Sequence, residues 1–159
     1  SDGFLVHPLN TRRSLEELTV PAIARGAARA GRSPADVELT CVTIIVTGRD
    51  ETELDRSREA VRAQLAFYGT TPAYRPVLDL HGRGHLHQQL KARAKRGEWV
   101  QMAELIDDEF LEAVAVVGEP DAIAPALRRR LVGISDHVSL VNNRAPDSLH
   151  FAEVVAGLR

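Results

Sequence analysis

The stretch that decides the fold is Val37-Glu-Leu-Thr-Cys-Val-Thr-Ile-Ile-Val46. It is dense in β-branched residues, which favour strands over helices. Its apolar carboxyl end does not alternate with polar side chains, which is typical of a central strand of a parallel sheet that is covered on both faces. We therefore predict a buried central strand over Val37–Thr47.

Two further strand-like runs, Gly3–His7 and Asp136–Asn142, lie on either side of this segment in the sequence, and long helical stretches separate the three. This alternation is typical of a parallel β/α sheet. Three parallel strands cannot close a barrel or cover their own edges. Because the chain also opens inside its first strand without an initiator Met, we expect the back half of a larger protein.

Helix signals occupy the connections between the predicted strands. Ser14 and Glu17 have the spacing of a capping box and predict a helix start at Ser14. Pro21 lies inside that stretch and should kink the helix or split it. Asp50 and Glu53 repeat the capping signature directly after the central strand. Both connections are therefore predicted to be helical.

The segment between the second and third strands is too long for a simple crossover. Residues 68–86 are rich in glycine and proline, and we expect an irregular excursion over the surface. Three helices are predicted to follow, at about 87–96, 99–106 and 108–115. The sequence therefore predicts a single partial-barrel domain over 1–159, with a helical insertion at about 68–117.

Composition limits the class of partner. The chain has 159 residues, of which 44% are hydrophobic and 26% charged, enough for one core. A net charge of -2 and a pI near 6.3 argue against nucleic acid or an anionic membrane, since both need a basic face. No apolar run reaches the ~20 residues of a membrane span. The single cysteine, Cys41, excludes an internal disulfide and fits a reducing cytoplasm.

Ligands in parallel β/α folds gather beyond the carboxyl ends of the strands, where loops vary over a rigid scaffold. This rule selects the polar residues that follow the three predicted strands, which are His7, Asn10, Thr47, Asn142, Asn143 and Arg144. Each of them has an alternative interpretation as a residue that caps a loop or hydrogen-bonds within it.

Tyr68-Gly-Thr-Thr-Pro-Ala-Tyr74 carries two tyrosines and two threonines around a glycine and a proline. Such a loop could fold over the mouth of a barrel and contact a planar ligand. The alternative is a surface loop that its two tyrosines anchor. The sequence does not decide between these interpretations.

His81, His85 and His87 invite a metal interpretation because they lie within seven residues. Gly82 and Gly84 oppose the helix that would stack His81 and His85 on one face, so we expect a solvated loop and no metal. The sequence also has no nucleophile elbow, Walker loop or dinucleotide fingerprint. No catalytic residue is therefore assigned.

Several segments, in this order, resemble the bacterial luciferase-like oxidoreductases. They are Asp2-Gly-Phe-Leu5, Arg29-Ala-Gly-Arg32, Thr47-Gly-Arg-Asp-Glu-Thr-Glu53, Phe67-Tyr-Gly-Thr-Thr-Pro-Ala-Tyr74, Leu80-His-Gly82 and Val116-Val-Gly-Glu-Pro-Asp121. Together they look like the branch usually assigned the deazaflavin cofactor, coenzyme F-420. The resemblance covers nearly the whole chain but only the C-terminal part of the family's TIM barrel, roughly its last three strands.

The resemblance implies a TIM barrel that binds a deazaflavin or FMN at its C-terminal mouth. It also implies hydride transfer to or from a small organic substrate, or flavin-type monooxygenation. His7 and Asn10 are the expected cofactor-binding residues. The insertion resembles the segment that caps the substrate side, so Tyr68, Tyr74 and His81 are expected there.

Three hypotheses remain at this point. The first is an oxidoreductase present as a C-terminal fragment, which forms a homodimer or associates with the missing N-terminal portion. The second is a non-catalytic luciferase-like remnant that acts as a binding or structural dimer, because open strand edges expose backbone that another chain can cover. The third is an unrelated small α/β binding domain.

Overall fold

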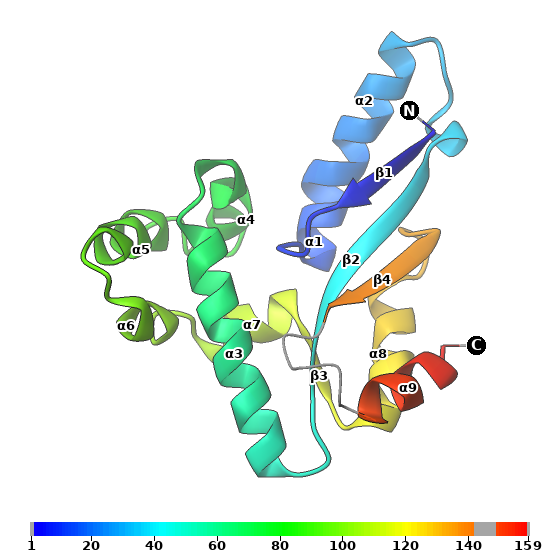
Figure 1. The fold of residues 1–159 in the computed structure, drawn as a ribbon. Coiled ribbons are helices and arrows are strands. Elements are labelled where there is room, and N and C mark those ends of the chain that lie inside the picture. Colours follow the sequence, from blue (N-terminus) through cyan, green and yellow to red (C-terminus); the bar gives the residue numbers. More distant parts are fainter. Residues whose placement is uncertain (1, 142–148, 159) are drawn as a thin grey trace.

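The central strand β2, Glu38–Thr47, is the axis of the sheet (Figure 1). The computed structural model describes residues 2–141 and 149–158. Every residue of β2 from Thr43 to Thr47 is buried, as the apolar carboxyl end of this segment predicted. The predicted α/β fold with parallel strands is confirmed, since three further strands all pair with β2 in parallel.

Two strands flank β2 on opposite edges. β1, Gly3–Val6, pairs with the first half of β2, and β4, His137–Val141, pairs with its middle. Both strands pair with Thr40 and Cys41, and one residue can serve two strands only when they lie on opposite sides. In the described sheet β4 therefore borders β2 directly.

A short fourth strand was not predicted. β3, Val116–Gly118, pairs with Ile45–Thr47 at the carboxyl end of β2. Three residues are too few to show the period of a strand, and Pro120 after them indicated only the start of the next helix. The sheet therefore has four strands where the sequence indicated about three.

Helices fill the connections. Their bounds are α1 Arg12–Ser14, α2 Val20–Arg29, α3 Glu51–Gly69, α4 Arg75–Leu80, α5 Leu86–Lys95, α6 Trp99–Ala103, α7 Asp108–Val114, α8 Pro120–Leu131 and α9 Leu149–Ala156. A short 3-10 turn at Pro34–Asp36 leads from α2 to β2, and another at Pro72–Tyr74 joins α3 to α4. Within the described residues, no helix combines the length and apolar character needed to cross a membrane.

The first helical stretch begins earlier than predicted. Its N-cap is Thr11, which forms a capping box with Ser14, so Ser14 lies inside the first turn and is not its cap. A π-helical turn, Leu15–Thr19, follows, and the Val20 N–H donates to the Leu15 carbonyl. Pro21 then lies in the first turn of α2, directly after this π-helical turn. The predicted split at Pro21 thus takes the form of a π-helical turn.

The second predicted cap is confirmed. Asp50 is the N-cap of α3 and accepts a hydrogen bond from the Glu53 N–H. The segment after α3 is more regular than expected, because α4 lies inside the predicted irregular excursion. Prolines open both the 3-10 turn and α4 there, so residues that indicated a loop serve as helix starts.

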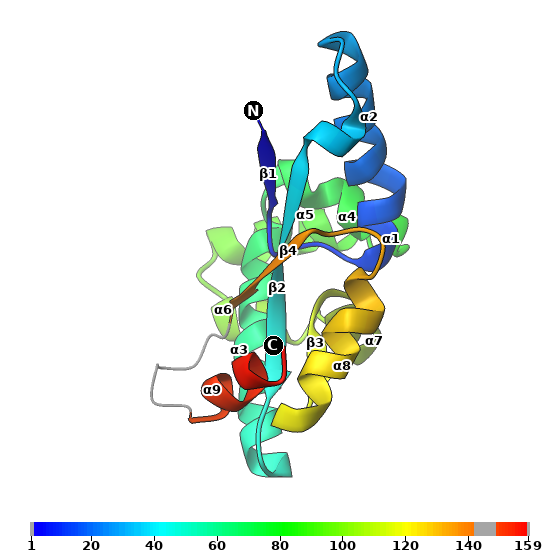
Figure 2. The same ribbon diagram turned by 90° about the vertical axis from the view of Figure 1, so that its right-hand side faces the viewer.

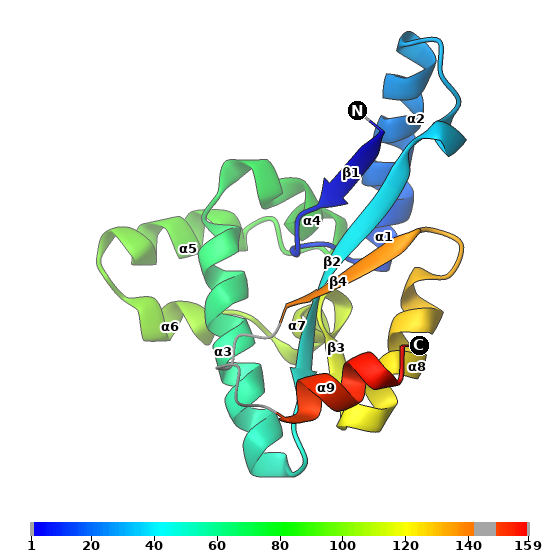
Figure 3. The same ribbon diagram turned by 45° about the vertical axis from the view of Figure 1, so that its right-hand side comes forward.

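The two faces of β2 pack into separate apolar clusters. Ile44 and Val46 face α3 and the helices α5 to α7, in a cluster that includes the fully buried Phe110. Cys41 and Ile45 face α8, whose contributions include Ile123. Figure 2 shows α3 and α8 on opposite sides of β2, and Figure 3 shows α4 to α6 beside α3, away from α8 and α9. The sheet is therefore a middle layer between two helical layers.

Candidate functional site

The loop after β1 is fastened to β2 by Asn10. The buried amide Nδ2 of Asn10 donates to the carbonyls of His7 and Val42, both at 2.8 Å. The Leu9 N–H donates to Nδ1 of His7 at 3.1 Å, so Nδ1 is an acceptor and the ring proton lies on Nε2. The loop thus fixes the tautomer of His7 at the carboxyl end of β1.

Three of the predicted residues form an aromatic cluster. The ring of His7 stacks on Tyr74 with centroids 4.2 Å apart and an interplanar angle of 20°. Tyr68 meets the His7 ring edge-on at 4.7 Å and lies 6.1 Å from Tyr74. The Tyr68 hydroxyl accepts a hydrogen bond from Gln64, one turn earlier in α3. The rings selected from sequence therefore join the end of β1, the last turn of α3, which holds Tyr68, and the 3-10 turn that ends at Tyr74.

His81 lies beside the same loop but outside the stack. Its Nε2 is 3.0 Å from the Thr11 hydroxyl, and its ring meets Phe110 edge-on at 5.7 Å. Burial lowers the pKa of His81, and the positive charges of Arg13 and Arg83 lower it further. Burial also lowers the pKa of His7. Both imidazoles therefore favour the neutral form at neutral pH.

The other strand-end candidates have different outcomes. Thr47 is buried, and its hydroxyl has no hydrogen-bond partner within the described residues. The Thr43 hydroxyl and Oδ1 of Asn10 are also buried and have no hydrogen-bond partner within the described residues. A buried polar group without a partner costs about 1–3 kcal/mol, so each is a candidate contact for a ligand or an ordered water. Asn142, Asn143 and Arg144 lie outside the described residues.

The histidines of residues 81–87 do not converge. His87 is buried and its Nδ1 lies 2.8 Å from the Gly69 carbonyl, whereas His81 contacts Thr11 and His85 is exposed. Over the described ranges, no group of three or more His, Cys, Asp or Glu side chains is arranged to hold a metal ion. His81 and His87 therefore have separate partners, and His85 is exposed.

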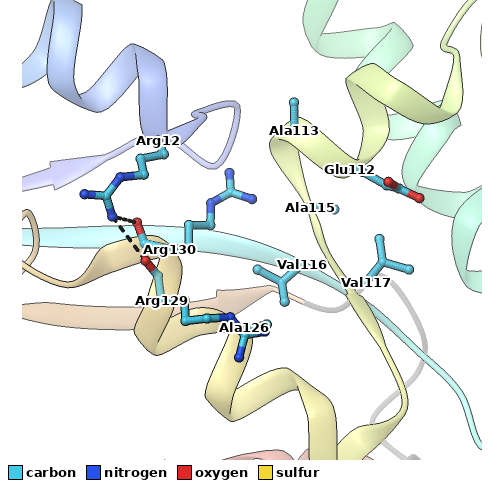
Figure 4. Close-up of a pocket in the computed structure, with 9 residues that line it drawn as sticks. All are labelled: Arg12, Glu112, Ala113, Ala115, Val116, Val117, Ala126, Arg129 and Arg130. Carbon is cyan, nitrogen blue, oxygen red and sulfur yellow. Dashed lines mark hydrogen bonds between the residues drawn. The ribbon is translucent and has the colours of Figure 1, made fainter.

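A second region, which the sequence analysis missed, is a cavity of about 560 Å³ between α1, α8 and the segment that leads into β3 (Figure 4). Its lining is Arg12, Glu112, Ala113, Ala115, Val116, Val117, Ala126, Arg129 and Arg130. We call it the arginine cavity. Its charged residues come from three distant segments, so no local motif indicated it.

The arginine cavity is coupled to the loop after β1. Nη2 of Arg130 donates to the Asn10 carbonyl at 2.8 Å. Nη1 of Arg12 donates to the carbonyls of Arg129 and Arg130, which caps the end of α8 with a positive charge. Burial lowers the pKa of Arg130 to about 10, so the guanidinium remains protonated at neutral pH. Asn10 therefore contacts both regions.

Comparison with known proteins identifies the family. The family model for luciferase-like monooxygenases matches residues 1–136. Uncharacterized proteins of Mycobacterium bovis and Mycobacterium tuberculosis are 51% identical over 138 residues, which is 87% of this chain and 41% of each relative. The 5,10-methylenetetrahydromethanopterin reductase of Methanopyrus kandleri is 27% identical over 158 residues, which covers 98% of this chain and 43% of that protein.

A solved structure shares the fold. The coenzyme F-420-dependent tetrahydromethanopterin reductase of Methanopyrus kandleri superposes with a TM-score of 0.72 at 25% identity, over 99% of this chain and 44% of that one. The chain thus spans less than half the length of the curated relatives it matches. Because the family model matches residues 1–136, which is most of this chain, the chain belongs to the luciferase-like monooxygenase family.

Proposed function

We propose that this chain is the C-terminal part of a deazaflavin- or flavin-dependent oxidoreductase that acts on a small organic substrate. Family membership supports an oxidoreductase. The observation that carries the finer proposal is the aromatic cluster, because His7, Tyr68 and Tyr74 meet at the carboxyl end of β1. That end of parallel strands is where β/α proteins bind ligands.

The side chains at the cluster fit a planar, polar-edged cofactor. Stacked and edge-on rings offer apolar faces of the kind that pack against an isoalloxazine-type ring system. His7 presents Nε2–H as a donor, because its Nδ1 already accepts from Leu9. In the described residues Oδ1 of Asn10 has no hydrogen-bond partner. A donor and a buried acceptor thus accompany the rings.

In this proposal each residue has a limited role. His7 and Asn10 hold the cofactor, and Tyr68, Tyr74 and His81 line the substrate side and exclude water. The cofactor, when bound, supplies hydride transfer or flavin-type oxygenation. The protein residues orient the reactants and keep both imidazoles neutral through burial.

Coenzyme F-420 is the first candidate cofactor and FMN the second. The order rests on the name of the solved Methanopyrus kandleri structure, a coenzyme F-420-dependent reductase. In both cases the substrate is a small organic molecule, which exchanges a hydride with the cofactor or is oxygenated. We further propose that the protein works in the cytoplasm, where the free thiol of Cys41 would stay reduced.

Titration of the protein with coenzyme F-420 and with FMN, followed by visible absorbance and fluorescence, tests the site. Tyr74→Ala removes the ring stacked on His7 and should weaken binding about tenfold, whereas Tyr74→Phe should retain it. Trp99→Ala is the matched control, since Trp99 is an exposed aromatic residue on α6. Failure to bind either cofactor, both in this chain and in a polypeptide of the relatives' length, would contradict the proposal.

The alternative is a non-catalytic luciferase-like protein that acts as a binding or structural dimer. Phe4 and Leu5 on β1 favour it, because they are 49% and 66% exposed and offer an apolar strand to a second chain. Two measurements together distinguish the functions: the intact mass of the protein, compared with the mass expected for its gene product, and the cofactor titration. The alternative would be supported by a tight dimer whose subunits have the mass of the 159-residue chain and bind neither cofactor.

A further inference from the structure

We propose that the arginine cavity is a binding site for an organic oxyanion, a molecule with a phosphate or carboxylate group on an apolar body. Arg130 anchors the anionic group, and Arg129 adds a second positive charge at the rim. The site is separate from the aromatic cluster and goes beyond the proposed oxidoreductase function. It requires no flavin or deazaflavin to be present.

The first argument is the state of Arg130. One guanidinium nitrogen donates to the Asn10 carbonyl, but Nε is buried and has no hydrogen-bond partner within the described residues. Figure 4 shows the guanidinium pointing toward the space between Arg12 and Ala113. A partly buried guanidinium with one buried donor unused is stabilised by an anion that accepts from that donor. Guanidinium groups bind phosphate and carboxylate with strong, charge-assisted hydrogen bonds.

The second argument is the charge around the cavity. Of its three arginines, Arg12 is paired with Glu16, at 2.8 Å. Within the described residues no ion pair is formed by Arg129 or Arg130. Glu112 is the only acidic lining residue among those described, and Figure 4 shows its carboxylate pointing away from the arginines. The cavity therefore retains an excess of positive charge.

The third argument concerns the polar atoms without partners on Arg130 and on the segments to which it is linked. Oδ1 of Asn10 and the Thr43 hydroxyl are buried and unpaired within the described residues, as is Nε of Arg130. Arg130 bonds to Asn10, and Asn10 bonds to Val42, the neighbour of Thr43. Of these atoms, only Nε of Arg130 belongs to a residue that lines the cavity, and because it is a donor an oxyanion can satisfy it.

The size and walls of the cavity define the ligand class. About 560 Å³ exceeds the need of an inorganic ion and lies in the range of small-molecule sites. The remaining wall is apolar and consists of Ala113, Ala115, Val116, Val117 and Ala126. An anion with an apolar body, such as a phosphate ester or an aromatic carboxylate, satisfies both the charged and the apolar parts.

Binding is measured by calorimetry on the whole chain at constant ionic strength, with inorganic phosphate, phenyl phosphate, benzoate and benzyl alcohol as probes. We expect millimolar or tighter binding of phenyl phosphate, weaker binding of inorganic phosphate and none of benzyl alcohol. The ratio of phenyl phosphate to benzoate affinity distinguishes a phosphate ligand from a carboxylate ligand. Displacement of phenyl phosphate by FMN but not by riboflavin would identify the phosphate of a flavin as the source.

Substitutions on α8 provide the matched comparison. Arg130→Gln should weaken phenyl phosphate at least about tenfold, since it removes a charge-assisted hydrogen bond. Arg129→Gln should weaken it severalfold. Arg128→Gln is the control, because Arg128 is exposed and donates to the Gly157 carbonyl at 3.0 Å, outside the cavity. Its affinity for phenyl phosphate should equal that of the wild type.

Arg130 also supports the loop after β1, so its variant could lose the fold. In that case the proposal is tested with Arg129→Gln, which removes a charge, and with Ala126→Leu, which narrows the cavity without changing a charge. Both should weaken phenyl phosphate while leaving the thermal midpoint near that of the wild type. The proposal is overturned if phenyl phosphate does not bind the wild type, or binds it and the Arg129 and Ala126 variants equally.

Discussion

Asn10 is the residue through which the two candidate regions meet. Its side chain bonds to the carbonyls of His7 and Val42, and its own carbonyl accepts from Arg130. His7 belongs to the aromatic cluster, and Arg130 lines the arginine cavity. Asn10 therefore contacts both regions, one through its side-chain amide and the other through its backbone carbonyl.

Asn10→Ala should lower the free energy of unfolding by about 1–3 kcal/mol. The substitution removes two side-chain hydrogen bonds and leaves the Val42 carbonyl without its partner in the protein interior. Urea denaturation followed by circular dichroism measures the change. Asn10→Asp retains the shape but cannot donate, so it should be at least as unstable. An unchanged urea midpoint in both variants would show that these bonds do not hold the loop.

Stability should fall as the pH is lowered from about 7 to 5. The pKa values of His7 and His81 lie below the ordinary value of 6.5, so the unfolded chain binds protons first as the pH falls. The unfolded state then holds more protons than the folded state, and acid favours unfolding. Above the unfolded pKa the stabilisation is fully present.

The measurement is the urea midpoint across this pH range for the wild type and for the double variant His7→Phe, His81→Gln. The double variant should show a shallower dependence on pH, whatever its absolute stability. His85→Gln is the control, because His85 is exposed, and it should retain the wild-type slope. Equal slopes in all three proteins would exclude His7 and His81 as the source.

At the scale of elements, the junction between β2 and α3 depends on Gly48. A Cβ added there would lie 2.6 Å from Cβ of Glu53 and 2.6 Å from the Leu54 amide nitrogen. These atoms belong to the first turn of α3, which Asp50 fixes as N-cap. The helix can start this close to the strand only because position 48 has no side chain.

Gly48→Ala should therefore destabilise the protein by roughly 1–3 kcal/mol, because the backbone of α3 must shift. Gly26→Ala is the opposite control, since Gly26 lies within α2 and an added Cβ meets nothing within 4 Å. Alanine favours a helix over glycine by about 0.8–1.0 kcal/mol, so this variant should be more stable. Thermal denaturation of the two variants should give midpoint shifts of opposite sign.

Elements with strong local signals were predictable from the sequence. The β-branched run of β2 and the cap at Asp50 lie where local physics places them. β3 was not predictable, because its three residues become a strand only by pairing with Ile45–Thr47. α4 was missed because Pro76 can open a helix as readily as it can mark a loop. Local patterns thus determine long elements, and tertiary pairing determines short ones.

The candidate site shows the same division. The strand-end rule selected His7 and Asn10, and the aromatic loop selected Tyr68 and Tyr74, but the stack of His7 on Tyr74 is a tertiary contact. The arginine cavity had no local signal, because Arg12 and Arg130 are far apart in sequence. Whether these residues bind a cofactor or an anion stays a prediction.

At the scale of the whole molecule, the two helical layers cover β2 but leave the flanking strands open. Among the described strands, β1 pairs with β2 alone, and Phe4 and Leu5 are well exposed. A groove beside β1 continues this apolar surface along α2, with Leu18 and Ile23 in its lining. An exposed parallel edge with large apolar side chains favours association with further polypeptide.

The 159-residue chain should therefore self-associate through β1, in a manner that depends on concentration. Leu5→Lys places a charge on the exposed strand and should shift the protein to monomer without loss of helix content, because Leu5 is 66% exposed. Val100→Lys is the control, since Val100 is 73% exposed on α6 and should leave association unchanged. Sedimentation velocity over the micromolar range measures both. A wild type that stays monomeric over the whole range would exclude self-association. Equal dissociation of the Leu5 and Val100 variants would show that the association surface is not β1.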